Sequence, residues 1–238
     1  MAIQKSFFAK IIPFLKARYA PRGARQTYAT CAEDLMVMDI LKELGVREGV
    51  IYVDIGAHHP IFGNNTYLAY RDGGSGVLVE PNEDLCTIIK TKRPRDICLN
   101  VGAGRETKEV EFYAFEKRTT RSTFSKEQAH EWQQSSGQVP VVQKKKIVSL
   151  DGILNVLGDR VPDFVSIDAE GYDIEILSGF TWSKRPKLFC IECMWREGQN
   201  HTKDERDQKI YEIMKQNDYL IEAQTRNNTL FIDKSFKK

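Results

Sequence analysis

The chain has 238 residues, of which 41% are hydrophobic and 29% charged, and its formal net charge is +2. These values are typical of one soluble globular domain, and so small a net charge argues against nucleic acid as an obligatory partner. The five cysteines lie in apolar segments, which indicates reduced thiols in a cytoplasmic protein. No apolar run has membrane-spanning length, and Lys10 and Pro13 interrupt the N-terminal apolar stretch, so we expect no signal peptide.

The pattern of residues 1–25 predicts a basic amphipathic segment with a bend at Pro13. In one interpretation the segment packs on its own domain or on a second copy of the chain, which would make a homo-oligomer. In the other, residues 1–20 contact a membrane surface or a carrier. We expect residues 26–238 to form a single domain.

The first half of that domain alternates strands with helices. A capping box at Thr30–Glu33 predicts a helix that ends near Gly45, and residues 51–55 read as a buried strand. Asn64 or Asn65 is predicted to cap a short helix, and Asn82 a longer one. Strands are predicted at residues 76–80 and 97–101, so the order β-α-β-α-β favours a parallel sheet.

The middle of the chain departs from this alternation of strands and helices. Residues 108–115 and 139–148 read as added strands, and residues 116–138 are polar without a clear period. We interpret residues 116–138 as a flexible cover beside the site, with plain disorder as the alternative. Asp151 is predicted to cap a short helix, and a capping box at Thr202–Glu205 to open another. The remaining predicted strands are residues 163–167, 187–191, 219–223 and 229–232.

An acid and a glycine follow the first strand closely. Asp54 lies at its carboxyl end, where doubly wound sheets bind ligands, and Gly56 lets the backbone approach a ligand. Glu80 comes 24 residues after Gly56, a spacing that suits a carboxylate accepting ribose hydroxyls. A dinucleotide enzyme would need the pattern Gly-x-Gly-x-x-Gly for pyrophosphate, and this loop has only Gly56 and Gly63. The pattern therefore favours S-adenosylmethionine (SAM), which carries positive charge and no phosphate.

A second group of acids follows later strands. Asp168, Glu170 and Glu192 are expected to meet at the carboxyl edge of the sheet. Converging carboxylates suit a hard cation such as Mg²⁺, which would activate an acceptor oxygen. The alternative is that Glu170 benefits from a helix N-terminus and that Glu192 pairs with a basic residue.

Two adjacent histidines, His58 and His59, follow the glycine loop. Either could act as a general base toward an acceptor hydroxyl. Because neighbouring loop residues point different ways, we expect at most one of them to face the site.

Several of these stretches resemble the FkbM-type family of SAM-dependent methyltransferases. They are Tyr52–Pro60, Val77–Asn82, Ser149–Asp151, the Glu33-Asp34-Leu35 lead-in and, most specifically, Ser166–Gly179 with its Asp-Ala-Glu-Gly-Tyr-Asp core. The resemblance covers roughly residues 26–195. It implies a class I methyltransferase fold, which is α/β, doubly wound and Rossmann-like. Its seven-stranded sheet is mostly parallel with an antiparallel last strand.

The resemblance also implies that Asp54, Gly56 and Glu80 bind SAM, that Asp168 and Glu170 lie beside the reacting centre, and that the reaction is O-methylation of a hydroxyl. From their positions in the sequence we further expect SAM to contact Ala57, Pro81, Asn100 and Asp168, and His58 or His59 to act at the reacting centre. The expected acceptor is a sugar, a glycan or a natural product. The alternative is a SAM-binding protein of the same fold that acts as a non-catalytic binding or scaffold subunit.

Overall fold

A seven-stranded sheet forms the centre of the protein in the computed structural model, which describes residues 25–115, 122–193 and 205–237, without the side chains of 205–207. Its strands are β1 (Ile51–Ile55), β2 (Ser75–Val79), β3 (Ile97–Leu99), β8 (Phe164–Ile167), β9 (Leu188–Glu192), β10 (Tyr219–Gln224) and β11 (Asn228–Asp233). Their spatial order is β10-β11-β9-β8-β1-β2-β3. β11 runs antiparallel to both of its neighbours, and the pairs from β9 to β3 are parallel. The predicted sheet, with its antiparallel last strand, is confirmed.

Helices cover both faces of this sheet. One face is covered by α2 (Glu33–Glu43), α3 (Tyr67–Arg71) and α4 (Glu83–Lys92), and the other by α6 (Leu150–Leu154), α7 (Asp173–Ser178) and α8 (Glu205–Gln216). Side chains of a strand alternate between the faces, so Val53 and Ile55 pack toward α6–α8 and Tyr52 toward α2–α4. Chain order reverses between β1 and β8, which places a ligand crevice at their carboxyl ends.

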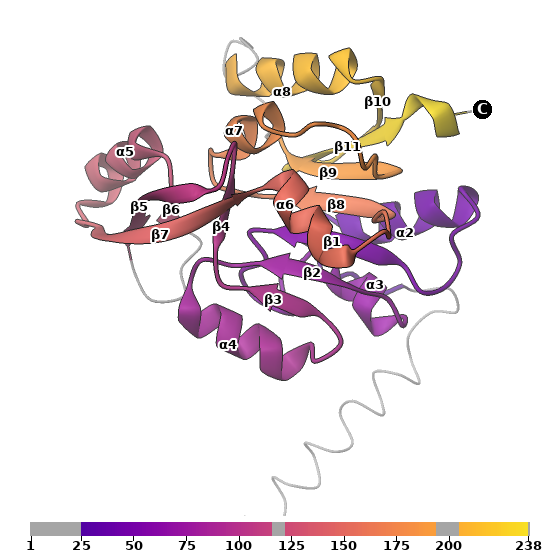
Figure 1. Cartoon of the computed structure of the whole chain (residues 1–238), viewed down its shortest axis with the longest axis horizontal. Coiled ribbons are helices and arrows are strands. Elements are labelled where there is room, and N and C mark those ends of the chain that lie inside the picture. Colours follow the sequence, from indigo (N-terminus) through magenta and orange to yellow (C-terminus); the bar gives the residue numbers. More distant parts are fainter. Residues whose placement is uncertain (1–24, 116–121, 194–204, 238) are drawn as a thin grey trace, which may run out of the picture.

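A second, four-stranded sheet projects beside the main one (Figure 1). It has the order β4-β7-β5-β6 and consists of β4 (Gly102–Gly104), β5 (Lys108–Ala114), β6 (Ser122–Thr123) and β7 (Val141–Ser149). The predicted added strands are confirmed. The prediction of an irregular cover over residues 116–138 is wrong for most of its length, because β6 and the helix α5 (Lys126–Ser136) lie there. The helix has no clear apolar period because Ala129 is its only buried residue.

Of the predicted starts of the longer helices, one agrees with the structure and one differs from it. Asn82 caps α4 as predicted, accepting the Leu85 N–H at 3.2 Å. α2 begins after Ala32, whose φ is 64°, so Thr30 is not its N-cap. Glu33 instead bridges to the C-terminal part of the chain, where Thr225 Oγ1 donates to its carboxylate at 2.7 Å.

Two shorter helices also start away from the predicted residue. α3 begins after Thr66, beyond both asparagines predicted to cap it. α6 begins after Ser149, whose hydroxyl accepts the Gly152 N–H, while Asp151 accepts the hydroxyl of Thr181 at 2.6 Å. Two single-turn 3₁₀ helices, Asn155–Leu157 and Lys234–Phe236, complete the described elements.

Some predictions cannot be compared with described structure. The amphipathic segment up to residue 24 and residues 202–204 of the last capping box lie outside the described ranges. Within those ranges, no helix combines the length and hydrophobicity that crossing a membrane requires. The five cysteines, all of them described, form no disulfide.

A buried arginine joins α4, β1 and the loop after β1. The side chains of Arg93 and Asp96 are both 0% exposed and pair at 2.6 Å. The Arg93 guanidinium also donates to Tyr52 Oη and Thr66 Oγ1 at 3.0 Å, and to Asn64 Oδ1 at 3.1 Å. Burial lowers the pKa of Arg93, but the nearby Tyr52 and the two aspartates outweigh it, and the net shift is upward. Arg93 therefore stays charged and holds three segments together.

We predict that Arg93→Met destabilises the protein by about 3–5 kcal/mol, because it leaves Asp96 buried without its charge partner. The free energy of unfolding from denaturant titration measures this change. The matched control is Arg25→Met, which removes an exposed pair with Asp39 and should cost no more than about 1 kcal/mol. Equal effects of the two variants would contradict the role given to Arg93.

Candidate functional site

A cavity of about 370 Å³ lies at the carboxyl ends of β1, β2 and β8. Six of its lining residues were predicted for the site: Gly56, His58, Glu80, Pro81, Asp168 and Glu170. Others were not predicted, and among these are Thr30, Phe62, Gly63, Asn82, Leu85, Phe112, Ser122 and Phe124. The cavity therefore brings the Glu80 side and the Asp168–Glu170 side of the predicted site into one space.

Glu80 is the buried carboxylate of this cavity. Its two oxygens accept backbone N–H groups, Oε2 from His58 at 2.9 Å and Oε1 from Asn82 at 2.7 Å. Burial raises the pKa of Glu80 to about 7, although these two hydrogen bonds lower it. A carboxylate has about four lone-pair sites, so each oxygen can accept a further hydroxyl. This is the capacity that two ribose hydroxyls require.

Asp54 does not line the cavity, contrary to its predicted place beside the ligand. It lies within β1, and its side chain points to the α2–α4 face of the sheet. There its Oδ2 accepts the Thr66 hydroxyl at 2.7 Å and the Asn64 amide at 3.0 Å. Burial raises the pKa of Asp54, and the charge of Arg93 is the largest influence that lowers it. Asp54 thus positions the loop that follows β1.

Gly56 lines the cavity, but the structure gives a further reason for a glycine here. Its φ is +79°, and a Cβ at this position would overlap the backbone carbonyl oxygen of Asp168. The close approach is therefore between the loops after β1 and β8. Ala57 and Asn100 lie outside the lining. Asn100 instead donates from Nδ2 to the Glu80 carbonyl oxygen at 2.9 Å, joining the ends of β2 and β3.

The two histidines have different surroundings, in line with the expectation that at most one faces the site. His58 lines the cavity and has a positive φ of 44°. His59 is outside the lining, and its Nδ1 accepts the backbone N–H groups of Ile61 and Phe62 at 3.1 and 3.0 Å. Burial, and then the charge of His58, lower the pKa of His59. His58 is therefore the histidine that lines the cavity.

The three carboxylates predicted to converge do converge. One oxygen from each of Asp168, Glu170 and Glu192 lies within 4.8 Å of the others, and all three residues are half-buried. Glu170 has a φ of 50°, and its carbonyl oxygen accepts the Thr123 hydroxyl of β6 at 2.8 Å. This donor set of carboxylate oxygens fits a hard divalent cation. Asp168 and Glu170 also line the cavity, whereas Glu192 does not.

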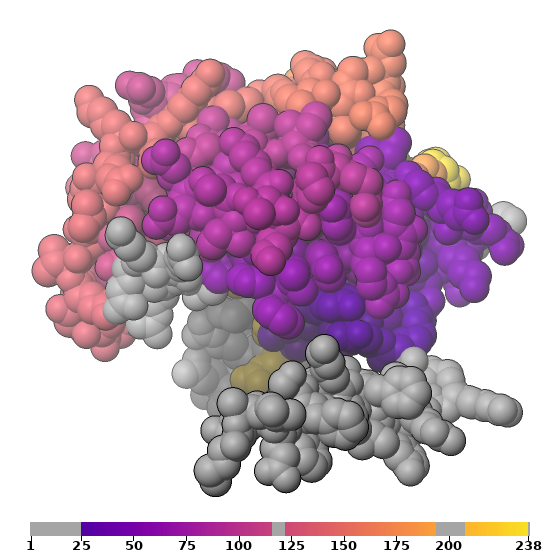
Figure 2. Space-filling model, turned by 90° about the horizontal axis from the view of Figure 1, so that it is seen from below, coloured from indigo at the N-terminus to yellow at the C-terminus, as the bar shows by residue number. Residues whose placement is uncertain are grey.

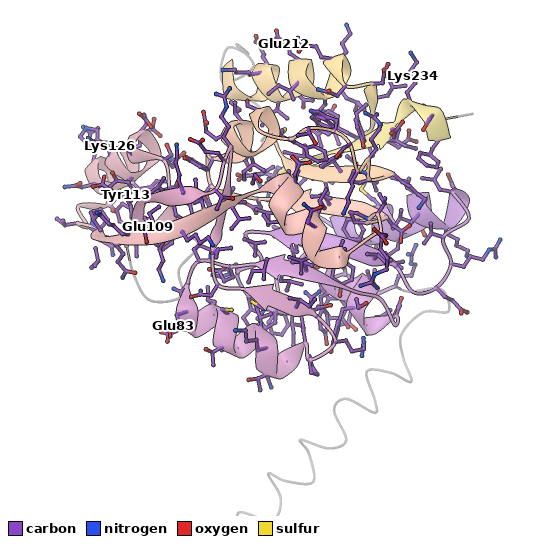
Figure 3. The ribbon with its side chains drawn as sticks, viewed as in Figure 1. Glu83, Glu109, Tyr113, Lys126, Glu212 and Lys234 are labelled. Carbon is purple, nitrogen blue, oxygen red and sulfur yellow. The ribbon has the colours of Figure 1, made fainter. Side chains whose placement is uncertain are left out.

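The small sheet supplies a cavity wall that sequence reasoning missed. Phe112 of β5 and Phe124 after β6 pack with ring centroids 4.8 Å apart, and both line the cavity. A second cavity of about 450 Å³ adjoins the first through Pro81, Asn82 and Phe112. It lies between the start of α4, marked by Glu83 in Figure 3, and the strands β5 and β7. Seen from below, the surfaces of α4 and β7 lie next to each other (Figure 2).

The amino-acid sequence matches the sequence model of a known protein family. The model described as the methyltransferase FkbM domain matches residues 54–221, which is more than half of the chain. The chain belongs to the FkbM methyltransferase family. FkbM proteins are SAM-dependent methyltransferases, so the resemblance inferred from the motifs is confirmed. No curated protein matches the chain.

Solved structures of methyltransferases are similar to this FkbM chain. Methyltransferase FkbM from Methylobacillus flagellatus has 16% identity and a TM-score of 0.46, over 78% of this chain and 43% of that one. This chain thus spans less than half of that protein's length. A TehB-like SAM-dependent methyltransferase from Corynebacterium glutamicum has 10% identity and a TM-score of 0.45, over 98% and 100% of the two chains. An O-methyltransferase from Bacillus cereus, in complex with SAH, has 14% identity and a TM-score of 0.42, over 95% and 90%.

The pKa of Glu80 leads to a prediction for cofactor binding. If its ionised carboxylate accepts the ribose hydroxyls, SAM affinity should fall about tenfold per pH unit below 7 and level off above it. Isothermal titration calorimetry across this pH range measures the change. Glu80→Gln should weaken binding and flatten the pH dependence, whereas Glu109→Gln, an exposed acid on β5 (Figure 3), should behave as wild type. A pH profile unchanged by Glu80→Gln would exclude Glu80 from ribose binding.

Proposed function

We propose that the protein is a SAM-dependent O-methyltransferase that acts on a hydroxyl of a sugar, a glycan or a natural product. One observation carries the proposal: Glu80, suited to a ribose, and Asp168 with Glu170, suited to a hydroxyl, line the same cavity. When bound, SAM supplies a methyl group on a positively charged sulfur. The acidic lining favours that charge, and Gly56 lets the loops after β1 and β8 approach each other closely, which brings the two sides of the cavity together.

The residues of the chain then act by binding, orientation and proton transfer. Glu80 orients the cofactor end of the cavity. Asp168 and Glu170 accept hydrogen bonds from the acceptor and orient its hydroxyl in line with the methyl group, which lowers the entropic part of the barrier. His58 lines the same cavity and can take the hydroxyl proton as the oxygen attacks.

Formation of S-adenosylhomocysteine (SAH) from SAM on a panel of hydroxylated acceptors tests the proposal. We expect the wild type to bind SAM and to form SAH only in the presence of an acceptor. Glu80→Gln, whose amide oxygen can still accept a backbone N–H, should lose SAM affinity and keep the fold, and Glu109→Gln should bind SAM as the wild type does. Tight SAM binding without SAH on any acceptor would instead support the alternative of a non-catalytic binding or scaffold subunit.

We also propose that Asp168, Glu170 and Glu192 bind a divalent cation such as Mg²⁺, because their oxygens lie within 4.8 Å of one another. A cation there would lower the pKa of the acceptor hydroxyl. Calorimetry should detect Mg²⁺ binding to the wild type and a much weaker signal for Glu192→Gln, and a chelator should stop turnover until Mg²⁺ is restored.

The cation site would be contradicted if a chelator did not change turnover and calorimetry detected no binding of Mg²⁺. Removal of the hydroxyl proton would then fall to a side chain. In that case His58→Ala should lower kcat by about 10²–10⁴-fold. His59→Ala is the matched variant, and its effect should appear in stability because His59 is bonded within its own loop.

The remaining partner assignments stay predictions. They are the contact of residues 1–20 with a membrane surface or carrier, assembly of a homo-oligomer, and independence from nucleic acid.

A further inference from the structure

Phe62 is an apolar side chain at an unusual place. It lines the cavity, yet 70% of it is exposed. Single exposed apolar residues are common on protein surfaces, so exposure alone has no meaning. What separates Phe62 from the other exposed apolar residues is how its loop holds it and where that loop runs.

The loop holds the Phe62 ring in a fixed place. His59 Nδ1 accepts the N–H groups of Ile61 and Phe62, which closes a tight turn around the imidazole. The rings of His59 and Phe62 then stack, with centroids 5.1 Å apart and planes 29° apart. Because Nδ1 accepts, it carries no proton, and the lowered pKa of His59 favours that neutral form. An ordered ring that faces solvent loses little entropy when a ligand covers it.

The path of the loop places Phe62 between the two halves of the site. At its start the His58 N–H donates to Glu80. At its end the Asn65 amide donates to Ser166 Oγ of β8 at 3.1 Å and to Cys190 Sγ of β9 at 3.7 Å. These two residues come two positions before Asp168 and Glu192 in the sequence. Phe62 thus belongs to a loop that joins Glu80 to the strands that lead to the other acids, and it lines the same cavity as Glu80, Asp168 and Glu170.

We propose that Phe62 is the platform on which a hydroxylated six-membered ring of the acceptor lies, with a hydroxyl directed to Asp168 and Glu170. The proposal rests on the proposed function, and it adds the shape of the acceptor. An aromatic face covers a flat apolar surface. An ionised carboxylate accepts hydrogen bonds and donates none. A ligand that satisfies both has an apolar face and hydroxyl groups on its edge. Pyranosides and catechols share this chemistry.

Ligand-observed saturation-transfer NMR on the full chain with SAH tests the platform without requiring turnover. The two probes are methyl α-D-glucopyranoside and 3,4-dihydroxybenzoate. The probe that receives saturation shows whether the acceptor ring is a pyranoside or a catechol. Phe62→Ala should lower the affinity for that probe about tenfold and leave the affinity for SAH unchanged. Phe62→Trp should retain binding. Phe236→Ala, at a phenylalanine 39% exposed in the C-terminal 3₁₀ helix, is the control and should bind as wild type.

Three results would overturn the platform: no binding of either probe to the wild type, equal binding by Phe62→Ala, or an equal loss of SAH affinity, which would make Phe62 a cofactor contact. The proposed function fails separately. If a probe binds in a way that depends on Phe62 but no methyl group is transferred, the platform is supported and the methyltransferase function is contradicted. If methyl transfer occurs and Phe62→Ala does not change the KM for the acceptor, the methyltransferase function is supported and the platform is contradicted.

Discussion

The buried ion pair of Arg93 and Asp96 is the constraint on which the site depends. Both side chains are fully buried, and burying charges is favourable only when they are paired and hydrogen-bonded. Arg93 meets this condition through Tyr52 of β1 and through Asn64 and Thr66 of the following loop. The same loop supplies the His58 N–H that binds Glu80, so this cavity carboxylate is positioned indirectly by a charge at the far end of α4. Stability and the geometry of the cavity are therefore linked through one guanidinium.

The position of each acid relative to the end of its strand decides what the acid does. Asp54 is the last but one residue of β1, where the pleat turns its carboxylate onto the α2–α4 face. Glu80 and Asp168 come one residue after β2 and β8, beyond the last ladder position, and both line the cavity. Glu192 ends β9 and lies outside the lining, although the pairing of Ile167 with Ile191 places it level with Asp168. Asp54 pairs with Leu78, so Glu80 lies two positions nearer the carboxyl edge of the sheet, and this difference separates an acid that holds the fold from an acid that can hold a ligand.

This dependence explains how much the sequence could predict. Apolar runs and caps such as Asn82 predict the main sheet and its order, and the converging acids follow from parallel strands ending at one edge. The roles of Asp54 and Arg93 could not be predicted, because they depend on strand ends and burial known to one residue. The sequence does carry a signal for α5, because Ser125-x-x-Gln128 is a capping box and Gly137 follows as a left-handed C-cap. Without an apolar stripe beside it, that signal alone does not distinguish a helix from a polar loop.

The cavity walls come from two parts of the protein, the loops of the main sheet and the small sheet, which are constrained to different degrees. The loops after β1, β2 and β8 are tied into the main sheet by Gly56 against Asp168 and by the backbone donors to Glu80, so change there disturbs the fold. Phe112, Ser122 and Phe124 come from the small sheet and the residue after β6, and Thr123 of β6 donates to the Glu170 carbonyl oxygen. The small sheet joins the main core through Ala103 of β4, but these three lining side chains lie outside that core cluster. They can therefore vary without repacking the main core, whereas the loops after β1, β2 and β8 cannot.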